Sequence, residues 1–412
     1  MAKKRKKKIE KPDTRSYENH PEVHGVISRE NWEFVSKINK QTKGFLETMW
    51  ANNLKENVES RLWEKHHALV DDCLNLAKNK AVIGIGAGAS FNRNKDILSY
   101  FIRHDGLKNW ENRAFITIAS NHQYKPLLEM GIIPDFVLLV DGSDVVYDQL
   151  CTDIPKHGNS TVLIAGLHCS PKVLNEWTDQ GRSIRFFINM AELVQKRFKE
   201  LTKQKAEKYQ MELGGNVLNG AWAISIARMG SNVFMSVGND LSYNIDPDIE
   251  KQRTGYYADG DYTTNAKITG TGRDEAGTQK RWAGISMERS LVVNPKGLDR
   301  YNINLEIVGT SHTLWVYKTW LESTLVRHND SPRSFHYFNC SEAGILGVMA
   351  KDSSDEALKD KNNWYMLDDV CRVYHTAMLK DAMEHFLKCK EIFECPQKLL
   401  YAQGAEDLVS LH

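Results

Sequence analysis

Short apolar runs alternate with helical patterns through the middle of this chain. The apolar runs are Ala81–Ile85, Ala114–Ile118, Phe136–Val140, Thr161–Ala165, Ile184–Ile188 and Asn232–Val237. Segments with apolar positions at helical spacing lie between most of them, such as Gln123–Met130, Pro171–Thr178 and Val217–Met229. Strands that alternate with helices indicate a mostly parallel sheet covered by helices on both faces. The pattern therefore predicts an α/β, Rossmann-like core over residues 80–243.

Helical patterns flank this core on both sides. Apolar positions three and four residues apart predict N-terminal helices within residues 31–79. After the core, residues 313–326 and 363–400 have helical patterns as well. Residues 305–412 are therefore expected to complete the core and to add C-terminal helices.

The periodicity is lost over residues 244–304, which this interpretation assigns to a loop-rich insertion or lid. Long irregular segments in compact proteins are usually lids, binding loops or insertions. Aromatic residues lie here among Asp and Gly, as in Gly255–Tyr262, and Val292–Pro295 with Leu305–Val308 predicts a short hairpin. The composition suits a sugar or heterocyclic ligand, and it suits an insertion that packs on itself equally well.

Composition describes an ordinary globular protein. The 412 residues are 41% hydrophobic and 26% charged. No apolar run approaches the roughly 18 residues that a membrane-spanning helix needs, and no signal peptide is visible. The seven cysteines are scattered without a matching Cys or His pair, which favours reduced thiols over a zinc site. A cytoplasmic protein without a membrane span is expected.

Charge is concentrated at the start of the chain. Residues 1–11 hold seven basic side chains and one Glu, a net charge of +6, so the remaining residues carry −5 against a total of +1. Residues 1–30 are therefore expected to form a basic, disordered tail, which either is solvated or contacts a polyanion. The mildly acidic remainder argues against a dedicated DNA-binding domain.

A glycine turn follows the first predicted strand. The segment Gly86–Ser90 reads Gly-Ala-Gly-Ala-Ser and leads into a helical pattern. Glycines allow a ligand to approach the backbone, and the next helix would present unpaired N–H groups to an anion. The spacing is not the dinucleotide fingerprint, and no Walker lysine is present. A phosphate cradle and a tight strand–helix turn explain the segment about equally well.

Polar residues follow several other predicted strands. Asn121 comes after the second strand, Asp141 and Asp144 after the third, and Gly238 and Asp240 after the last. Ligands of such sheets bind beyond the carboxyl ends of the strands. The sequence therefore predicts a ligand site at this edge.

Several motifs occur in the order found in one protein family. They are Gly86–Ser90, the Pro134-Asp135 segment that leads to a strand and Asp141, Gly214–Val217 before a helix rich in small residues, Gly238–Tyr243, Thr313–Glu322 and Phe338–Gly347. Together they resemble the domain shared by bacterial motility accessory factors (Maf) and the archaeal 6-hydroxymethylpterin pyrophosphokinase MptE. Ala89 stands where the family usually has Pro, and Asn216 where it usually has Ser.

The resemblance implies a transferase with a nucleotide-activated donor. The Maf branch is similar to bacterial sialyltransferases and uses CMP-sugars, whereas the MptE branch moves pyrophosphate from ATP with Mg²⁺. Both chemistries place a phosphate ester over the glycine turn and need its charge neutralised as the leaving group departs.

Candidate donor-binding residues follow from these motifs. They are Gly86, Gly88, Ser90, Asn121, Gly215, Asn216, Asn219, Gly238 and Asp240. Asn121 and Asn219 could bond a base or ribose, or serve turns and caps. Ser90 could bond a phosphate, cap the next helix, or do both.

Candidate catalytic residues are one carboxylate and a few histidines. Asp141 is the favoured catalytic residue and, with Asp144, could hold Mg²⁺, although Asp144 is equally suited to cap a helix. His312 and His168 are candidate acids or bases, and His122 belongs with them, but each has packing as its alternative.

Three functions remain open at this stage. The leading one is a Maf-like glycosyltransferase with a CMP-activated sugar donor. The alternative is an MptE-like pyrophosphokinase that uses ATP and a hydroxymethyl heterocycle. The third is a non-catalytic nucleotide- or nucleic-acid-binding protein. The acceptor, whether protein, sugar or small molecule, is not identified.

Overall fold

The computed structural model describes most of the chain. The described residues are 16–106, 108–242, 291–299, 302–309, 312–329, 335–341, 344–351, 357, 360 and 363–388. Residues 1–15 of the predicted tail, most of the predicted insertion over 244–304, and residues 389–412 lie outside them. Among the described residues, no helix combines the length and apolar character needed to cross a membrane.

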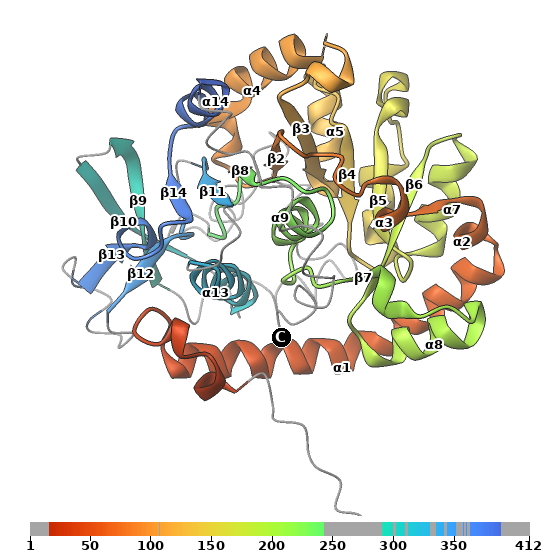
Figure 1. The fold of residues 1–412 in the computed structure, drawn as a ribbon, viewed down its shortest axis with the longest axis horizontal. Coiled ribbons are helices and arrows are strands. Elements are labelled where there is room, and N and C mark those ends of the chain that lie inside the picture. The colour runs from red at the N-terminus through yellow and green to blue at the C-terminus, as the bar shows by residue number, and fades with distance from the viewer. Residues whose placement is uncertain are drawn as a thin grey trace, which may run out of the picture.

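A parallel sheet of ten strands forms the centre of the described part. Its strands are β1 (His67–Ala68), β2 (Ala81–Ile85), β3 (Phe115–Ser120), β4 (Phe136–Leu139), β5 (Val162–Gly166), β6 (Ile184–Asn189), β7 (Gln210–Met211), β8 (Val233–Val237), β11 (His336–Asn339) and β14 (Tyr374–Thr376). They lie in the order β1-β6-β5-β4-β3-β2-β8-β11-β14, with β7 beside β6. The predicted Rossmann-like α/β fold is confirmed (Figure 1).

The strand order reverses between β2 and β8. From β2 the chain adds β3 to β6 on one side, and it then returns to place β8 on the other side of β2. The two strands end side by side at Gly86 and Gly238. A Cβ on Gly86 would lie 2.4 Å from the carbonyl oxygen of Gly238, so the approach requires a residue without a side chain. Such a switch point is where ligands of open α/β sheets bind.

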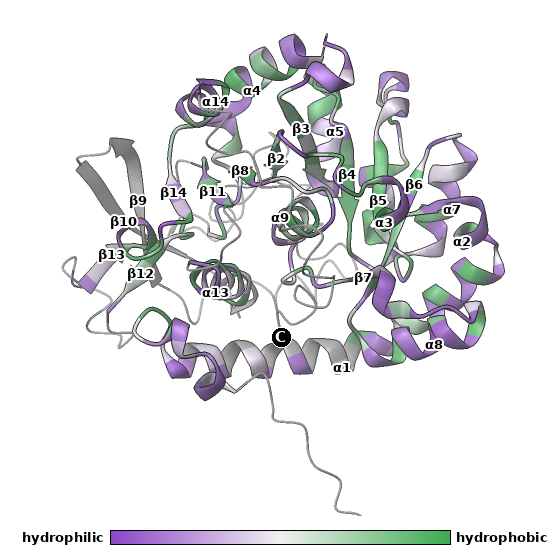
Figure 2. Ribbon diagram, viewed as in Figure 1, coloured by the Kyte–Doolittle hydropathy of each residue, from purple (hydrophilic) through white to green (hydrophobic). Residues whose placement is uncertain are grey.

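Helices cover both faces of the sheet. The helices are α1 (Arg29–Glu59), α2 (Leu62–Lys65), α3 (Leu69–Asp72), α4 (Phe91–Gly106), α5 (Asn121–Glu129), α6 (Tyr147–Leu150), α7 (Pro171–Asp179), α8 (Glu192–Thr202), α9 (Val217–Ala227), α13 (His312–Arg327) and α14 (Leu379–Lys388). Val82 and Leu138 pack with α9 and α13, whereas the neighbouring Ile83 packs with α4 and α14. Figure 2 shows the hydrophobic character of the central strands, which these two layers bury.

Helix α1 runs along one side of the molecule from α8 to α13 (Figure 1). Its Asn53 side chain donates to the Gly142 carbonyl at 2.7 Å. Its Asn57 side chain donates to the carbonyls of Leu167 and Cys169, each at 2.9 Å. The predicted N-terminal helix thus fixes the loops that follow β4 and β5.

Two predicted helices differ from the structure. Residues 61–79 form the short helices α2 and α3 with β1 between them, because Arg61 has a left-handed backbone with φ 63° that ends α1. Residues 363–376 form β13 (Trp364–Met366), a single 3-10 turn and β14, and only α14 is helical. There, pairing of Tyr374 with Tyr337 of β11 outweighs the local helical pattern.

Two antiparallel pairs complete the described fold. The predicted hairpin is confirmed as β9 (Leu291–Asp299) with β10 (Asn302–Gly309). The second pair is β12 (Val348–Ala350) with β13.

Candidate functional site

A cavity of about 470 Å³ opens at the carboxyl ends of the strands, at the switch point. The loops after β2, β3, β4 and β8 line it together with the starts of α9 and α13. It brings together nine predicted site residues, namely Gly86, Gly88, Asn121, His122, Asp141, Gly215, Asn216, Gly238 and Asp240. Of the other candidates, Ser90, Asn219, Asp144 and His168 do not line it.

The glycine turn after β2 is closed by contacts within the protein. The Gly86 amide donates to the Val237 carbonyl at 2.8 Å, and the Gly88 amide donates to the Gly238 carbonyl at 2.9 Å. The Ser90 amide donates to Asp240 Oδ2 at 2.9 Å, and the Ser90 hydroxyl donates to Asp240 Oδ1.

The Asp240 carboxylate thereby occupies the place at the start of α4 where a bound anion would otherwise lie. A Cβ on Gly88 would lie 2.7 Å from Asp240 Cγ, so the turn is shaped around this side chain. Burial raises the pKa of Asp240, while the Ser90 hydrogen bonds lower it. A phosphate at the same place would meet a like charge, which favours the tight-turn interpretation of Gly86–Ser90 over the phosphate cradle.

The start of α9 offers the donors that the glycine turn does not. Gly214 and Gly215 have φ values of +62° and +84°, which turn the chain into the helix. Asn216 caps the helix, and its side-chain oxygen accepts from the Asn219 amide at 2.7 Å. The first amides of a helix have no acceptor within it, and here those of Val217 and Leu218 belong to cavity-lining residues. The helix dipole adds to their attraction for an anion.

The side chain of Asn219 supports this turn by hydrogen bonds beneath the cavity wall. Its side chain is fully buried and donates to the carbonyls of Gly214 at 3.1 Å and Tyr317 at 2.9 Å. These bonds tie the glycine turn to α13. The structure thus places Asn219 beneath the cavity wall, where it supports the turn and does not face a ligand.

Tyr317 is a cavity residue that the sequence analysis did not single out. Its ring packs on Gly215, where a Cβ would lie 2.4 Å from Tyr317 Cε1. Burial, and then the negative charge of Asp141, raises the pKa of Tyr317 to about 12. The phenol therefore stays protonated near neutral pH and can donate a hydrogen bond. Its only signal in the sequence was its place within the Thr313–Glu322 motif.

The two candidate metal ligands, Asp141 and Asp144, form hydrogen bonds with different partners. Asp141 lines the cavity and accepts from the Ser143 amide at 2.8 Å and the Ser143 hydroxyl at 2.9 Å. Asp144 is exposed and accepts from the hydroxyl of Ser170, the residue that caps α7. Within the described residues, no cluster of three or more His, Cys, Asp or Glu could hold a metal. The donor set fits Mg²⁺ only through Asp141 together with ligand phosphates.

The candidate histidines have different surroundings. His168 is buried beneath Gly166, where a Cβ would lie 2.1 Å from its ring, and it packs edge-on against Trp50. Burial lowers the pKa of His168 to about 4, against a smaller rise from its hydrogen bond to the Val140 carbonyl. It is therefore a neutral packing residue. His312 begins α13, but its side chain lies outside the described residues.

His122 lines the cavity within a polar network. Asn121 Nδ2 donates to Gln149 Oε1 at 2.6 Å, and Gln149 Nε2 lies 3.2 Å from His122 Nδ1. The sequence did not indicate Gln149, because this residue lies on the short helix α6 after β4 and not directly at the end of a strand.

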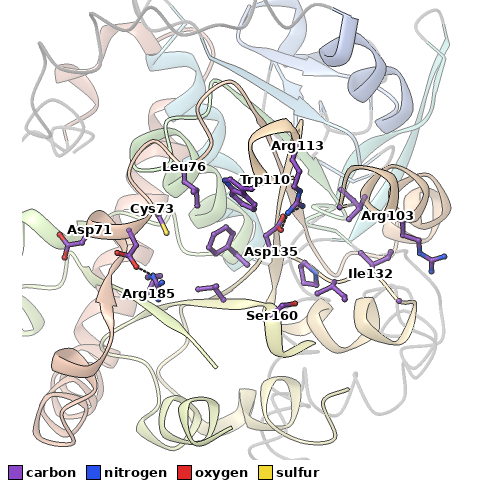
Figure 3. Close-up of a pocket in the computed structure, with 18 residues that line it drawn as sticks. Asp71, Cys73, Leu76, Arg103, Trp110, Arg113, Ile132, Asp135, Ser160 and Arg185 are labelled. Atoms are coloured by element: carbon purple, nitrogen blue, oxygen red, sulfur yellow. Dashed lines mark hydrogen bonds and ion pairs between the residues drawn. The ribbon is translucent and has the colours of Figure 1, made fainter. Parts of the chain in front are cut away.

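A larger cavity of about 880 Å³ lies at the opposite, amino-terminal edge of the sheet (Figure 3). Four of its charged side chains form two pairs: Arg113 bonds Asp135 at 2.7 Å and Arg185 bonds Asp72 at 2.8 Å. Asp135, from the Ile-Pro-Asp motif, also accepts from the amide and hydroxyl of Thr117. This motif therefore holds the starts of strands together, and the smaller cavity is the better candidate site.

The fold and the cavity define an α/β, Rossmann-like protein with a polar site at its switch point. Residues 50–246 match the family described as 6-hydroxymethylpterin diphosphokinase MptE-like. The resemblance expected from the motifs is thus confirmed for this segment, which carries the sheet from β1 to β8 and is similar to that family. The activity in the family's description is a transferase activity.

One solved structure that matches this chain is that of the MAf glycosyltransferase from Magnetospirillum magneticum AMB-1. The two share 12% sequence identity with a TM-score of 0.45, and the similarity covers 86% of this chain and 43% of that one. This chain therefore spans less than half of that protein, and no residue is transferred from it. No curated protein matches the chain.

Proposed function

We propose that this protein is a nucleotide-dependent transferase, and specifically a Maf-like glycosyltransferase that takes a sugar from a CMP-activated donor. The observation that carries the proposal is the start of α9, whose first amides belong to residues lining a polar cavity at the switch point. A phosphate ester placed there would face two amide donors and the positive end of the helix dipole. Asn121, Asn216 and Asn239 line the same cavity and offer amide groups for a base and ribose.

The cavity residues supply the parts of a transfer step. The acceptor oxygen attacks the anomeric carbon while the bond from that carbon to the phosphate oxygen breaks. Asp141 takes the proton from the acceptor hydroxyl. The departing phosphate gains charge, which the α9 amides and the protonated Tyr317 hydroxyl stabilise.

Transfer of pyrophosphate from ATP is the second candidate, because the matching family is described as a diphosphokinase family. That chemistry calls on Mg²⁺ to neutralise the phosphate charge. Asp141 would hold the ion together with phosphate oxygens, without help from Asp144. Of the two carboxylates that line the cavity, Asp240 is already bonded to Ser90, which leaves Asp141 for the reaction. This distribution favours the CMP-sugar reaction, since one carboxylate suffices there.

A thermal-shift panel tests the two candidates. The purified protein is heated with CMP, CDP, UDP, GDP, ADP or ATP, each with and without Mg²⁺. Stabilisation by CMP without Mg²⁺ is the expected result and directs the next assays to CMP-sugars. Stabilisation by ATP only with Mg²⁺ would instead support pyrophosphate transfer. If no nucleotide shifts the melting temperature, the transferase proposal is wrong.

A further inference from the structure

A buried ion pair on α13 follows directly after the cavity residue Tyr317. Lys318 and Glu322 lie one helical turn apart, and only 2% and 1% of their surfaces are exposed. The Lys318 ammonium lies 2.7 Å from Glu322 Oε1 and 2.6 Å from Oε2. The Glu322 Oε1 atom also accepts from the Gly347 amide at 2.8 Å. Because a buried carboxylate loses much when a partner is removed, this bond fixes Gly347 against α13.

Gly347 ends a short segment, residues 344–347, that packs on the turn after β8. The Ile345 amide of this segment donates to the Asp240 carbonyl at 2.9 Å. A Cβ on Gly344 would lie 2.3 Å from the same carbonyl oxygen, so the approach requires a residue without a side chain. Segment 344–347 thus lies between Glu322 on one side and Asp240 on the other.

The turn after β8 has a backbone that its neighbours must hold. Leu241 has a φ of 52°, in the left-handed region that a residue with a large side chain rarely adopts. Such a conformation persists where the surrounding structure constrains it. The Asn239 amide donates to the Ser341 hydroxyl at 2.9 Å, and segment 344–347 supplies the bond to Asp240. The whole turn, residues 239–242, lines the candidate cavity.

We infer that Glu322 is a positioning residue of the candidate cavity: it holds segment 344–347, and that segment holds the cavity turn 239–242. Neither Lys318 nor Glu322 lines the cavity, so both act through the turn. The inference rests on the proposed function for one consequence, namely that affinity for the nucleotide falls when Gly347 loses its acceptor.

Two double variants isolate the bond from Glu322 to Gly347. Lys318→Met/Glu322→Gln removes both charges and keeps a side-chain oxygen for the Gly347 amide. Lys318→Met/Glu322→Met removes the charges and that oxygen, with a side chain of similar size. Neither variant leaves an unpaired buried charge, the costly result of a single substitution. Asp105→Asn is the control for lost stability, since Asp105 is a buried carboxylate that binds the Ala114 and Phe115 amides at the other edge of the sheet.

Hydrogen exchange of single amides tests the positioning without any nucleotide. The Asn239 and Ile345 amides are expected to exchange at least tenfold faster in the Met/Met variant than in the Met/Gln variant. Equal exchange in the two variants overturns the inference. If the Met/Met variant does not fold, the natural chain decides: the Asn239 and Gly347 amides should exchange through one common opening. A Gly347 amide that opens locally, while the Asn239 amide exchanges only on global unfolding, overturns the inference.

CMP affinity of the folded variants, measured by calorimetry well below their melting temperatures, tests the consequence. The expected result is at least a fivefold weaker affinity in the Met/Met variant, with the Met/Gln variant and Asp105→Asn within twofold of the natural chain. Equal affinities in the two double variants, or an equal loss in Asp105→Asn, overturn the consequence. Failure of the natural chain to bind any nucleotide defeats the proposed function and leaves the exchange result intact.

Discussion

Single side chains in this molecule take their roles from partners far away in the sequence. Asp240 follows β8, yet its carboxylate bonds Ser90 at the start of α4. Asp144 follows β4, yet it bonds the cap residue of α7. In both cases a residue that looked like a ligand donor stabilises a helix start instead. Asp141 keeps its place on the cavity wall.

Ser90→Ala is expected to lower the free energy of unfolding by about 1.5–3 kcal/mol, because a buried carboxylate loses a hydrogen-bond donor. Urea unfolding measures the loss, and Ser60→Ala, which removes a bond to a neutral carbonyl, serves as the control. Since Ser90 lowers the pKa of Asp240, its removal raises that pKa further. The loss of unfolding free energy is therefore largest above the raised pKa of Asp240 and becomes smaller as the pH falls through that pKa. A deficit that is independent of pH would contradict this account.

Asp141→Asn is expected to leave the fold intact and to reduce sugar transfer by roughly 10²–10⁴-fold, the usual contribution of a general base. Asn can still accept from Ser143, so thermal stability should hardly change. Initial rates with the CMP-sugar found in the donor screen measure the effect, with Asp148→Asn at an exposed site as the control. Activity of the natural chain that survives a chelator would rule out a metal role for Asp141.

At the scale of elements, the two helices that start near the switch point play different parts. The start of α4 is already bound to Asp240, whereas the first amides of α9 belong to cavity-lining residues. The glycine turn before α9 is held by Asn219 and covered by Tyr317 of α13. This difference supports the proposal that α9, and not α4, binds the anion.

Val217→Pro tests that assignment. Proline is accepted at the first position of a helix, where it removes one N–H and little else, and Asn216 before it has the extended backbone that proline requires. CMP affinity, measured by calorimetry, is expected to fall by roughly tenfold, about the 1.4 kcal/mol of one hydrogen bond to a charged group. Glu192→Pro, at the first position of α8, should leave affinity unchanged. Equal affinity in both variants would remove α9 from the site.

At the scale of the whole molecule, charge and fold are separate features. Seven basic residues cluster in the first eleven positions, outside the described part, while the cavity is built by the strand-end loops and the starts of α9 and α13. Nucleotide binding and polyanion binding are therefore expected to be independent.

Deletion of residues 2–11 is expected to abolish any affinity for a polyanion such as heparin, together with its dependence on salt. The same deletion should leave the melting temperature and the CMP shift unchanged. Retention on a heparin column at graded salt measures the first effect. Unchanged retention after the deletion would locate polyanion binding in the folded part and would contradict the predicted role of the tail.

The sequence by itself determined six of the ten strands of the central sheet, β2 to β6 and β8, and the loops that gather at its edge, because apolar periodicity and strand-end glycines are local signals. It also indicated the resemblance to the MptE-like family, because the motifs of that family are continuous segments. The helices predicted from the local pattern over residues 61–79 and 363–376 were wrong. The left-handed backbone of Arg61 ends α1 before the first range, and pairing of β14 with β11 outweighs the helical pattern in the second.

Only the tertiary structure decided which side chains share the cavity and which support it. Ser90 and Asp240 are 150 positions apart, and Asn219 and the Tyr317 carbonyl are 98 apart. Hydrogen-bond partners at such separations depend on how strands are ordered in the sheet, which no local pattern encodes. For that reason the glycine turn after β2 looked like the phosphate site in the sequence, and the start of α9 became the better candidate once the chain was folded.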